Sequence, residues 1–248
     1  MKTLKLSILA IIAAMAVCGC EDDNDSDNND KKEEKEEYKI DARGHDYVDL
    51  GLTSGTLWAT TNIGSDSPYK SGDFFAWGET TSKTSSSWSN YKYCNGTYKS
   101  LTKYNFDSNY GDVDNNFSLD LDDDAAHVNW GGDWVTPSKT QVKELFNECE
   151  WQWTSHNDAY GYTIKGRNGN HIFLPTMGYY SSDRPIYPMH GGYWTSSLYI
   201  SKPWTAFIMT FYFKGYSTTW EYRYIRKNIR PVITPKETSK QKGKDAEE

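Results

Sequence analysis

All ten tryptophans of the 248-residue chain lie between residues 38 and 233, and this confinement decides which part of the chain can fold. A segment of roughly 200 residues is long enough for one domain with a well-formed hydrophobic core. Aromatic residues make up 15% of the chain, more than a core of this size can enclose. Many tryptophan and tyrosine rings must therefore lie partly exposed, as they do on surfaces that bind sugars or proteins.

The first twenty residues have the layout of a secretion signal. Lys2 and Lys5 precede an apolar stretch, residues 6–17, which is too short to cross a bilayer. The stretch leads to Cys20 in a sequence that resembles a bacterial lipobox, whose cysteine is lipid-modified and becomes the new N-terminus. We therefore expect removal of residues 1–19 and lipidation of Cys20; an ordinary signal peptide is the alternative. The acidic residues after Cys20 resemble an export signal, which predicts an outer-membrane lipoprotein exposed at the cell surface.

Negative charge is concentrated in the segment that follows Cys20. Residues 21–37 contain ten Asp or Glu and three Lys, a net charge of −7 that equals the net charge of the whole chain. The segment 20–37 has too few apolar residues to fold and is expected to be a flexible tether, and the tail 234–248 is expected to be mobile as well. The domain, residues 38–233, is consequently close to neutral, and we expect no nucleic-acid partner.

Short runs of β-forming residues alternate with turn residues near both ends of the domain, while helical patterns lie in the middle. The clearest helix is expected to begin at Thr136 and Pro137, and a shorter one lies within residues 123–127. The pattern predicts an α+β fold with an antiparallel sheet, one or two helices and long irregular loops. The apolar face of the clearest helix would comprise Val142, Leu145, Phe146 and Cys149.

A series of motifs occurs in order along residues 45–233: Val48-Asp49-Leu50-Gly51-Leu52, Gly72-Asp73-Phe74-Phe75-Ala76-Trp77, Trp130-Gly131-Gly132-Asp133-Trp134, Phe173-Leu174-Pro175 with Gly178, Tyr193-Trp194-Thr195-Ser196-Ser197 and Ile229-Arg230-Pro231-Val232. The series resembles the Fibrobacter major paralogous domain family. That family is similar to the C-type-lectin-like fold in its formylglycine-generating-enzyme branch, which implies paired N- and C-terminal strands and an irregular, loop-rich binding half. The chain departs from the family at Arg226 and Lys227, where relatives usually carry Gly.

The sequence contains no catalytic motif that we recognise. Formylglycine-generating enzymes hold copper with a close cysteine pair, whereas Cys94 and Cys149 are far apart and lack matching neighbours. A disulfide bond between them and two free thiols are both compatible with the sequence. The five histidines show no zinc-ligand spacing, and Gly-x-Ser-x-Gly is absent. We expect no enzymatic activity and no resident metal, and an enzyme of unknown class, such as one with paired carboxylates, remains an alternative.

One stretch of the domain is rich in the oxygen ligands that calcium prefers. Its spacing is not that of an EF-hand, because Gly111 occupies a ligand position and no Glu closes the loop. Calcium therefore stands as an alternative to a solvated acidic loop with helix-capping aspartates. The residues concerned are Asp107, Asn109, Asp112, Asp114, Asn116, Asp120, Asp122, Asp123 and Asp124.

Residues 199–228 alternate aromatic with polar side chains and carry the main functional prediction. Period-two alternation places Phe207, Met209, Phe211 and Phe213 on one strand face, and core packing is the simplest role for Phe211 and Phe213. Other aromatics of the region have turn-like or polar surroundings, typical of rigid rings in binding surfaces. We predict that the region binds a glycan or a surface protein, with a structural or assembly role as the alternative. The predicted ligand-binding residues are Tyr199, Lys202, Trp204, Tyr216, Trp220, Tyr222 and Tyr224.

Overall fold

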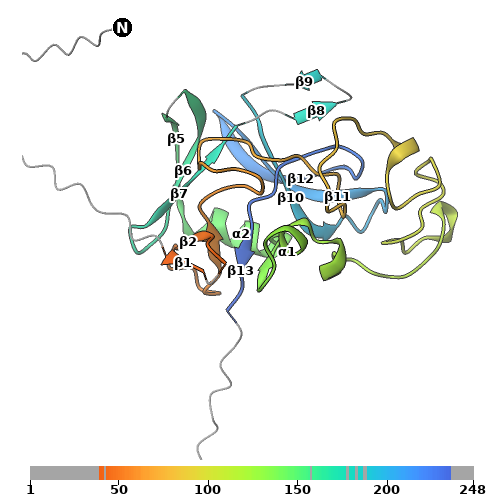
Figure 1. The fold of residues 1–248 in the computed structure, drawn as a ribbon, viewed down its shortest axis with the longest axis horizontal. Helices are drawn as coiled ribbons and strands as arrows, with labels where there is room; N and C mark the ends of the chain where they lie inside the picture. The colour runs from red at the N-terminus through yellow and green to blue at the C-terminus, as the bar shows by residue number, and fades with distance from the viewer. Residues whose placement is uncertain are drawn as a thin grey trace, which may run out of the picture. The chain divides into compact units, whose positions relative to one another are not determined.

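The computed structural model describes residues 39–41, 43–156, 158–176, 179–181, 184–186 and 189–235. All of them belong to one compact unit, residues 36–248. The expected signal (1–19), Cys20, the tether (20–37), residues 236–248 of the tail and Gly178 lie outside the described residues. The described part combines antiparallel sheets with two α-helices, so the fold is α+β and mostly sheet (Figure 1). None of its helices is long and apolar enough to cross a membrane.

A five-stranded sheet joins the two ends of the domain. Its order is β1 (Lys39–Ile40), β2 (Asp46–Asp49), β3 (Leu57–Ala59), β13 (Val232–Ile233) and β4 (Trp134–Val135). β13 is antiparallel to both neighbours, with Val232 opposite Trp58 on β3 and opposite Val135 on β4. Strands from the beginning, the middle and the end of the domain therefore meet in one sheet (Figure 1).

The remaining strands form hairpins between neighbours in the sequence. β5 (Glu150–His156), β6 (Ala159–Lys165) and β7 (His171–Pro175) make one sheet. β10 (Gly191–Leu198), β11 (Thr205–Tyr212) and β12 (Gly215–Tyr222) make a second, and β8 (Tyr179–Ser181) pairs with β9 (Arg184–Ile186). Each of these pairings is antiparallel.

The sheet β10–β11–β12 lies between two hydrophobic cores. Because successive side chains on a strand point to opposite faces, β11 places Ala206 and Ile208 in one core and Met209 and Phe211 in the other. Helix α2 (Lys139–Glu148) packs against this sheet. A sheet that is covered on both faces needs apolar residues at consecutive positions, which is why β11 reads as a nearly continuous apolar run.

Helix α2 begins later than the sequence suggests. Its N-cap is Ser138, whose hydroxyl accepts a hydrogen bond from the Gln141 N–H while the Gln141 side chain accepts one from the Ser138 N–H. The prediction of a start at Thr136 and Pro137 was wrong, because Thr136 instead donates from its backbone and hydroxyl to Asp124. The predicted apolar face is confirmed: Val142 and Leu145 are buried, and Phe146 and Cys149 pack against the same core.

The predicted shorter helix is present as α1 (Ala125–Trp130), and Asp124 is its N-cap. The Asp124 carboxylate accepts hydrogen bonds from the Ala126 and His127 N–H groups as well as from Thr136. One buried carboxylate thus fixes both the start of α1 and the approach to α2. Burial raises its pKa despite these hydrogen bonds.

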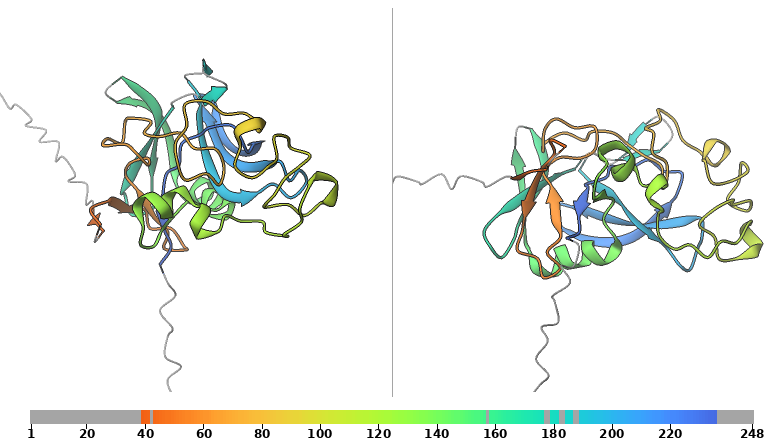
Figure 2. Two further views of the ribbon diagram at one scale, coloured as in Figure 1. Left: turned by 45° about the vertical axis from the view of Figure 1, so that its right-hand side comes forward. Right: turned by 60° about the horizontal axis from the view of Figure 1, so that its bottom comes forward.

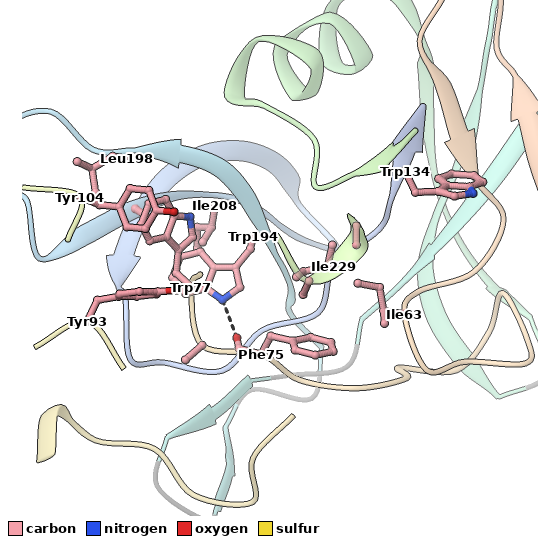
Figure 3. Close-up of a cluster of buried hydrophobic side chains, with 14 of the residues drawn as sticks. Ile63, Phe75, Trp77, Tyr93, Tyr104, Trp134, Trp194, Leu198, Ile208 and Ile229 are labelled. Atoms are coloured by element: carbon pink, nitrogen blue, oxygen red, sulfur yellow. Dashed lines mark hydrogen bonds between the residues drawn. The ribbon is translucent and has the colours of Figure 1, made fainter. Parts of the chain in front are cut away.

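Two buried tryptophans join the segment around residue 75 to strand β10 (Figure 3). Trp194 donates from Nε1 to the Phe75 carbonyl at 2.8 Å, and Trp77 donates from Nε1 to the Thr195 carbonyl at 2.8 Å. Tyr104 meets the Trp77 ring edge-on with a centroid separation of 5.0 Å. The indole N–H groups of Trp77 and Trp194 therefore each have an acceptor, so these side chains are buried without leaving a polar group unpaired.

Arg230 is fully buried and connects three parts of the chain. Its guanidinium donates to the Ala59 and Thr60 carbonyls at the end of β3, to Asn62 Oδ1, and to the Phe173 carbonyl on β7. Burial lowers the pKa of this group. The guanidinium carries N–H donors on three nitrogens and can reach all four acceptors at once. Lysine has a single nitrogen and could not donate to all four.

Cys94 and Cys149 are free thiols. Cys94 packs against the core that contains Trp77, and Cys149 packs against the core that contains Val142. The disulfide that the sequence left open is therefore not formed. Burial raises the pKa of Cys149 to about 11 and also raises the pKa of Cys94, so both groups are protonated at neutral pH.

Replacing Arg230 by lysine is expected to destabilise the protein by about 3 kcal/mol, because several buried acceptors lose their donors. Urea unfolding followed by tryptophan fluorescence measures this free energy. Arg167→Lys is the matched control, since Arg167 is exposed and only 3.5 Å from Glu148 in an ion pair. Equal stability of the two variants would contradict the role assigned to Arg230.

We expect alkylation to label both domain cysteines without prior reduction. In protein unfolded in denaturant, iodoacetamide should modify the peptides that contain Cys94 and Cys149, as read by mass spectrometry. In folded protein at pH 8 the Cys149 reaction should be slow, because its thiol is partly buried and protonated. A domain disulfide would instead leave both peptides unmodified until a reductant is added.

Candidate ligand-binding surface

Nine aromatic side chains form a continuous series of ring contacts along one region of the domain. Neighbouring rings in the series have centroids between 4.5 and 6.2 Å apart. All nine rings are partly exposed, and Tyr222 is the most open with 40% of its surface accessible. We call this series the aromatic belt; in contact order it comprises Tyr110, Trp204, Tyr98, Trp88, Tyr224, Tyr222, Trp220, Tyr199 and Phe207.

One end of the aromatic belt is built on the β10–β11–β12 sheet. Phe207 and Trp220 are directly opposite each other on β11 and β12, so their rings share a face. Tyr199 meets Phe207 edge-on at 5.0 Å and stacks with Trp220 at 6.1 Å. Tyr199 itself is held by hydrogen bonds in the β10–β11 turn, where its N–H donates to the Thr205 carbonyl and its carbonyl accepts from Lys202.

The other end comes from the long segment between residues 85 and 117, which lies beside these strands (Figure 2). Trp204 contacts two rings of this segment, Tyr110 at 4.5 Å and Tyr98 at 5.3 Å. Trp88 contacts Tyr224 at 4.9 Å. The aromatic belt therefore joins two regions that are about a hundred residues apart in the sequence.

The long segment is folded on itself through Leu101. The Leu101 N–H donates to the Tyr110 carbonyl at 2.7 Å, and the Leu101 carbonyl accepts from the Asp112 N–H at 2.8 Å. Gly111, between these partners, has a φ of 125°, and a Cβ there would lie 2.1 Å from the Leu101 carbonyl oxygen. Only glycine fits this approach, so the turn requires Gly111.

Arg223 fastens the long segment to the strands. It is fully buried and donates to the Lys103 and Tyr104 carbonyls of the segment, to the Pro203 carbonyl of the β10–β11 turn, and to the Tyr91 hydroxyl. Its guanidinium also lies over the Trp77 ring at 5.0 Å. Arg223 thus fixes the spacing between the two halves of the aromatic belt.

Asp123 holds the same segment from the other side. Its carboxylate accepts from Lys103 Nζ at 2.5 Å, from the Tyr104 hydroxyl at 2.7 Å and from Lys92 Nζ at 3.1 Å. Burial alone would raise the pKa of Asp123, but these hydrogen bonds, led by that from Lys103, hold the pKa well below its usual range. The carboxylate is therefore charged at neutral pH and stabilises the fold in that form.

The acidic stretch 107–124 has structural partners throughout much of its length. Asp114 accepts from the Tyr104, Asn105 and Asn116 N–H groups, and Asp107 accepts from the Asn109 N–H. Among the described residues, no three His, Cys, Asp or Glu side chains are grouped so that they could hold a metal ion. These contacts account for Asp107 and Asp114 as turn caps.

Five of the seven predicted ligand-binding residues belong to the aromatic belt: Tyr199, Trp204, Trp220, Tyr222 and Tyr224. Lys202 contacts it, since its ammonium group lies 4.1 Å above the Trp220 ring. Tyr216 does not; it stacks on Trp151 at 4.3 Å and contacts Phe146 of α2 at 4.9 Å. Tyr216 is therefore exposed at a separate place, next to Trp151 and Phe146.

Sequence reasoning missed Trp88, Tyr98 and Tyr110 as members of the aromatic belt. The expected packing role of Phe211 is confirmed, but that of Phe213 was wrong: β11 ends at Tyr212, and Phe213 is exposed in the turn that follows. The segment between residues 80 and 121 is unusually long for a loop and contains several aromatic residues, and these two features could have pointed to it as part of a functional surface. Nothing in the alternation of residues 199–228 indicates which distant rings meet Trp204 or Tyr224.

A separate pocket of about 130 Å³ lies between the β5–β6–β7 sheet and residues 60–69. His156 and His171 line it together with Tyr69, Thr163 and Phe173. Among the lining residues that the structure describes, none is a carboxylate or a lysine. The described lining therefore supplies two imidazoles and one phenol to this pocket.

Replacing Asp123 by asparagine should destabilise the protein at pH 7 by about 2 kcal/mol. A carboxyl group whose pKa is lowered by folding contributes stability above its unfolded pKa of about 4 and loses it as the pH falls further. The difference between the variant and the unchanged protein should therefore shrink between pH 7 and pH 2 in urea unfolding. Asp66→Asn is the control, because Asp66 pairs with Lys70 on the open surface. A pH-independent difference would contradict this role of Asp123.

Comparisons with family models, with curated proteins and with solved structures found no match to this chain. No relative therefore contributes a site or an activity. Any functional argument has to start from the geometry of the aromatic belt and of the residues that hold it in place.

Proposed function

We propose that the chain is a surface-anchored, non-catalytic lipoprotein that binds an extracellular glycan or protein ligand through the aromatic belt. The observation that carries this proposal is the belt itself, with nine partly exposed rings in continuous contact. Partly exposed tyrosine and tryptophan rings gathered in one region are typical of recognition surfaces. In this proposal Cys20 carries the lipid, residues 20–37 are the tether, and the outer membrane is the anchor.

The proposal includes membership in the Fibrobacter major paralogous domain family and a C-type-lectin-like fold. The pairing of β13 with β3 supports it, because the family resemblance implies joined N- and C-terminal strands. The long segment between residues 85 and 117 supports it as well, since it supplies the expected loop-rich half of the domain. In this fold the loop-rich half is where a ligand would bind.

The rings of the aromatic belt are suited to recognition because they are held before a ligand arrives. Arg223 and Asp123 fix the long segment on the strands through buried hydrogen bonds. Tyrosine and tryptophan have few rotatable bonds, and contact with neighbouring rings restricts them further. Little side-chain entropy is then lost on binding, which favours affinity.

The belt also lacks the chemistry of a catalytic site. Its members are tyrosine, tryptophan and phenylalanine, and the charged groups that lie over its rings are the lysines Lys139 and Lys202. General acid–base catalysis needs a group whose pKa is near the working pH, usually His, Asp or Glu. The composition of the belt therefore supports binding and not turnover.

The test is a binding screen of the purified full-length chain against glycan and surface-protein arrays. We expect selective binding that is lost in the Trp204→Ala/Trp220→Ala/Tyr222→Ala variant, because three neighbouring ring surfaces are removed. Each aromatic contact is worth on the order of 1 kcal/mol or more at a binding surface. Near-ultraviolet circular dichroism checks that the variant remains folded.

Tyr216→Ala is the matched control, because Tyr216 is exposed and aromatic but lies outside the aromatic belt. Binding lost only with Tyr216→Ala would move the site to the neighbourhood of Trp151. Absence of binding on both arrays would favour a structural or assembly role in a surface complex.

A further inference from the structure

Two lysine side chains lie over rings at one end of the aromatic belt. The ammonium group of Lys139, at the start of α2, is 3.5 Å from the centroid of the Phe207 ring. The ammonium group of Lys202, in the β10–β11 turn, is 4.1 Å from the centroid of the Trp220 ring. Because Phe207 and Trp220 are opposite each other on neighbouring strands, the two positive charges belong to one patch. We call Lys139, Lys202, Tyr199, Phe207 and Trp220 the cationic end of the belt.

The charges at the cationic end are not neutralised from within the described part of the chain. Neither Lys139 nor Lys202 forms an ion pair there, whereas Lys70, Lys83 and Lys103 each pair with a carboxylate. The acidic residue next to Trp220 in the sequence is Glu221, which is on the opposite face of β12 and is 3.5 Å from Lys227. The patch therefore presents net positive charge on an aromatic surface.

The surroundings of Lys139 add to this positive charge. Desolvation, and then the nearby Lys143, lower the pKa of Lys139, which shows that the local environment disfavours its charged form. An anionic group placed beside Lys139 would relieve this unfavourable charge. Cation–π contact with Phe207 and Trp220 keeps both lysines over the rings, so a ligand meets charges that are already positioned.

We propose that the cationic end of the belt binds an acidic polysaccharide, in which carboxylate or sulfate groups pair with Lys139 and Lys202 while sugar rings pack on the rings that continue from this end, Tyr222 and Tyr224. This inference rests on the proposed function and specifies the class of ligand. The flat faces of half-exposed tryptophan and tyrosine rings suit the apolar face of a sugar ring. A charged polymer of sugars also matches the length of the belt, because successive rings continue from Trp220 through Tyr222 and Tyr224 to Trp88.

An acidic peptide could pair with the same lysines but would use the rest of the belt less well. Its side chains are flexible and would lose more entropy on ordering than the rigid rings of a polysaccharide. The continuous row of ring contacts therefore favours the polysaccharide. The peptide is one outcome that the test separates.

The test measures the affinity of the full-length chain for pairs of polymers that differ only in charge. Polygalacturonate and its methyl ester report on carboxylates, and chondroitin sulfate and its desulfated form report on sulfates. Polyglutamate is the peptide probe. We expect one acidic polymer to bind at least about ten times more tightly than its neutral partner in isothermal titration calorimetry, and added salt to weaken that binding.

The variant Lys139→Gln/Lys202→Gln should lower the affinity for the acidic polymer about ten-fold and leave binding of the neutral partner unchanged. The matched control is Lys165→Gln/Lys214→Gln, which removes the same charge from exposed lysines outside the belt. Lys214 is a close match because it also lies over an aromatic ring, Phe213, at 5.2 Å. The control should bind like the unchanged protein.

The outcomes separate this inference from the function on which it rests. Belt-dependent binding that is equal for acidic and neutral polymers, or that is unchanged by Lys139→Gln/Lys202→Gln, would overturn the acidic specificity and leave the binding function standing. Lysine-dependent binding of polyglutamate without binding of either acidic polysaccharide would overturn the assignment of ligand class. Both proposals would be overturned if no polymer bound and if binding on the arrays were the same for the unchanged protein and the Trp204→Ala/Trp220→Ala/Tyr222→Ala variant.

Discussion

The domain depends on two guanidinium groups that are buried without carboxylate partners in the described structure. Arg230 and Arg223 are inaccessible to solvent, and both are surrounded by backbone carbonyls and neutral oxygens. A desolvated charge of this kind is tolerated only when nearly all of its donors are satisfied. The end of β3, Asn62 and β7 must therefore all be in place to accept hydrogen bonds from Arg230. In the same way, the long segment and the β10–β11 turn must both be in place to accept hydrogen bonds from Arg223. Loop positions follow from these hydrogen bonds more than from apolar packing.

The placement of aromatic residues follows from the limited volume of the two cores. Trp58, Trp77, Trp134 and Trp194 are fully buried, with the indole N–H groups of Trp77 and Trp194 bonded to carbonyls. Other rings lie partly exposed on the β10–β11–β12 sheet and in the long segment that Arg223 holds against it. Further exposed rings, such as those of Tyr160 and Phe213, lie outside the aromatic belt. The aromatic belt is thus in part a consequence of the aromatic content of the chain.

Much of the local structure could be predicted from the sequence, and the grouping of distant residues could not. The i, i+3, i+4, i+7 spacing correctly identified the buried face of α2 at Val142 and Leu145. Alternation along β11 correctly placed Phe207, Met209 and Phe211 on one face, because that depends only on the strand geometry. It could not tell that Phe146 and Trp151 contact Tyr216 on the neighbouring strand β12. The start of α2 was misjudged for a similar reason, since Asp124 competes for Thr136 from outside the helix.

The order of strands in the terminal sheet has a mechanical consequence. β1 has two residues and lies at the edge of the sheet, with Lys39 opposite Tyr47 at the open end of its hairpin. A pull applied at Lys39 would separate this hairpin one residue pair at a time, which requires little force, whereas β3 is held between β2 and β13. Under tension the terminal hairpin would therefore open before the force reached Arg230 and the rest of the sheet. Opening the hairpin would thus release extra chain length at the N-terminal end of the domain while the sheet behind it and the aromatic belt kept their structure.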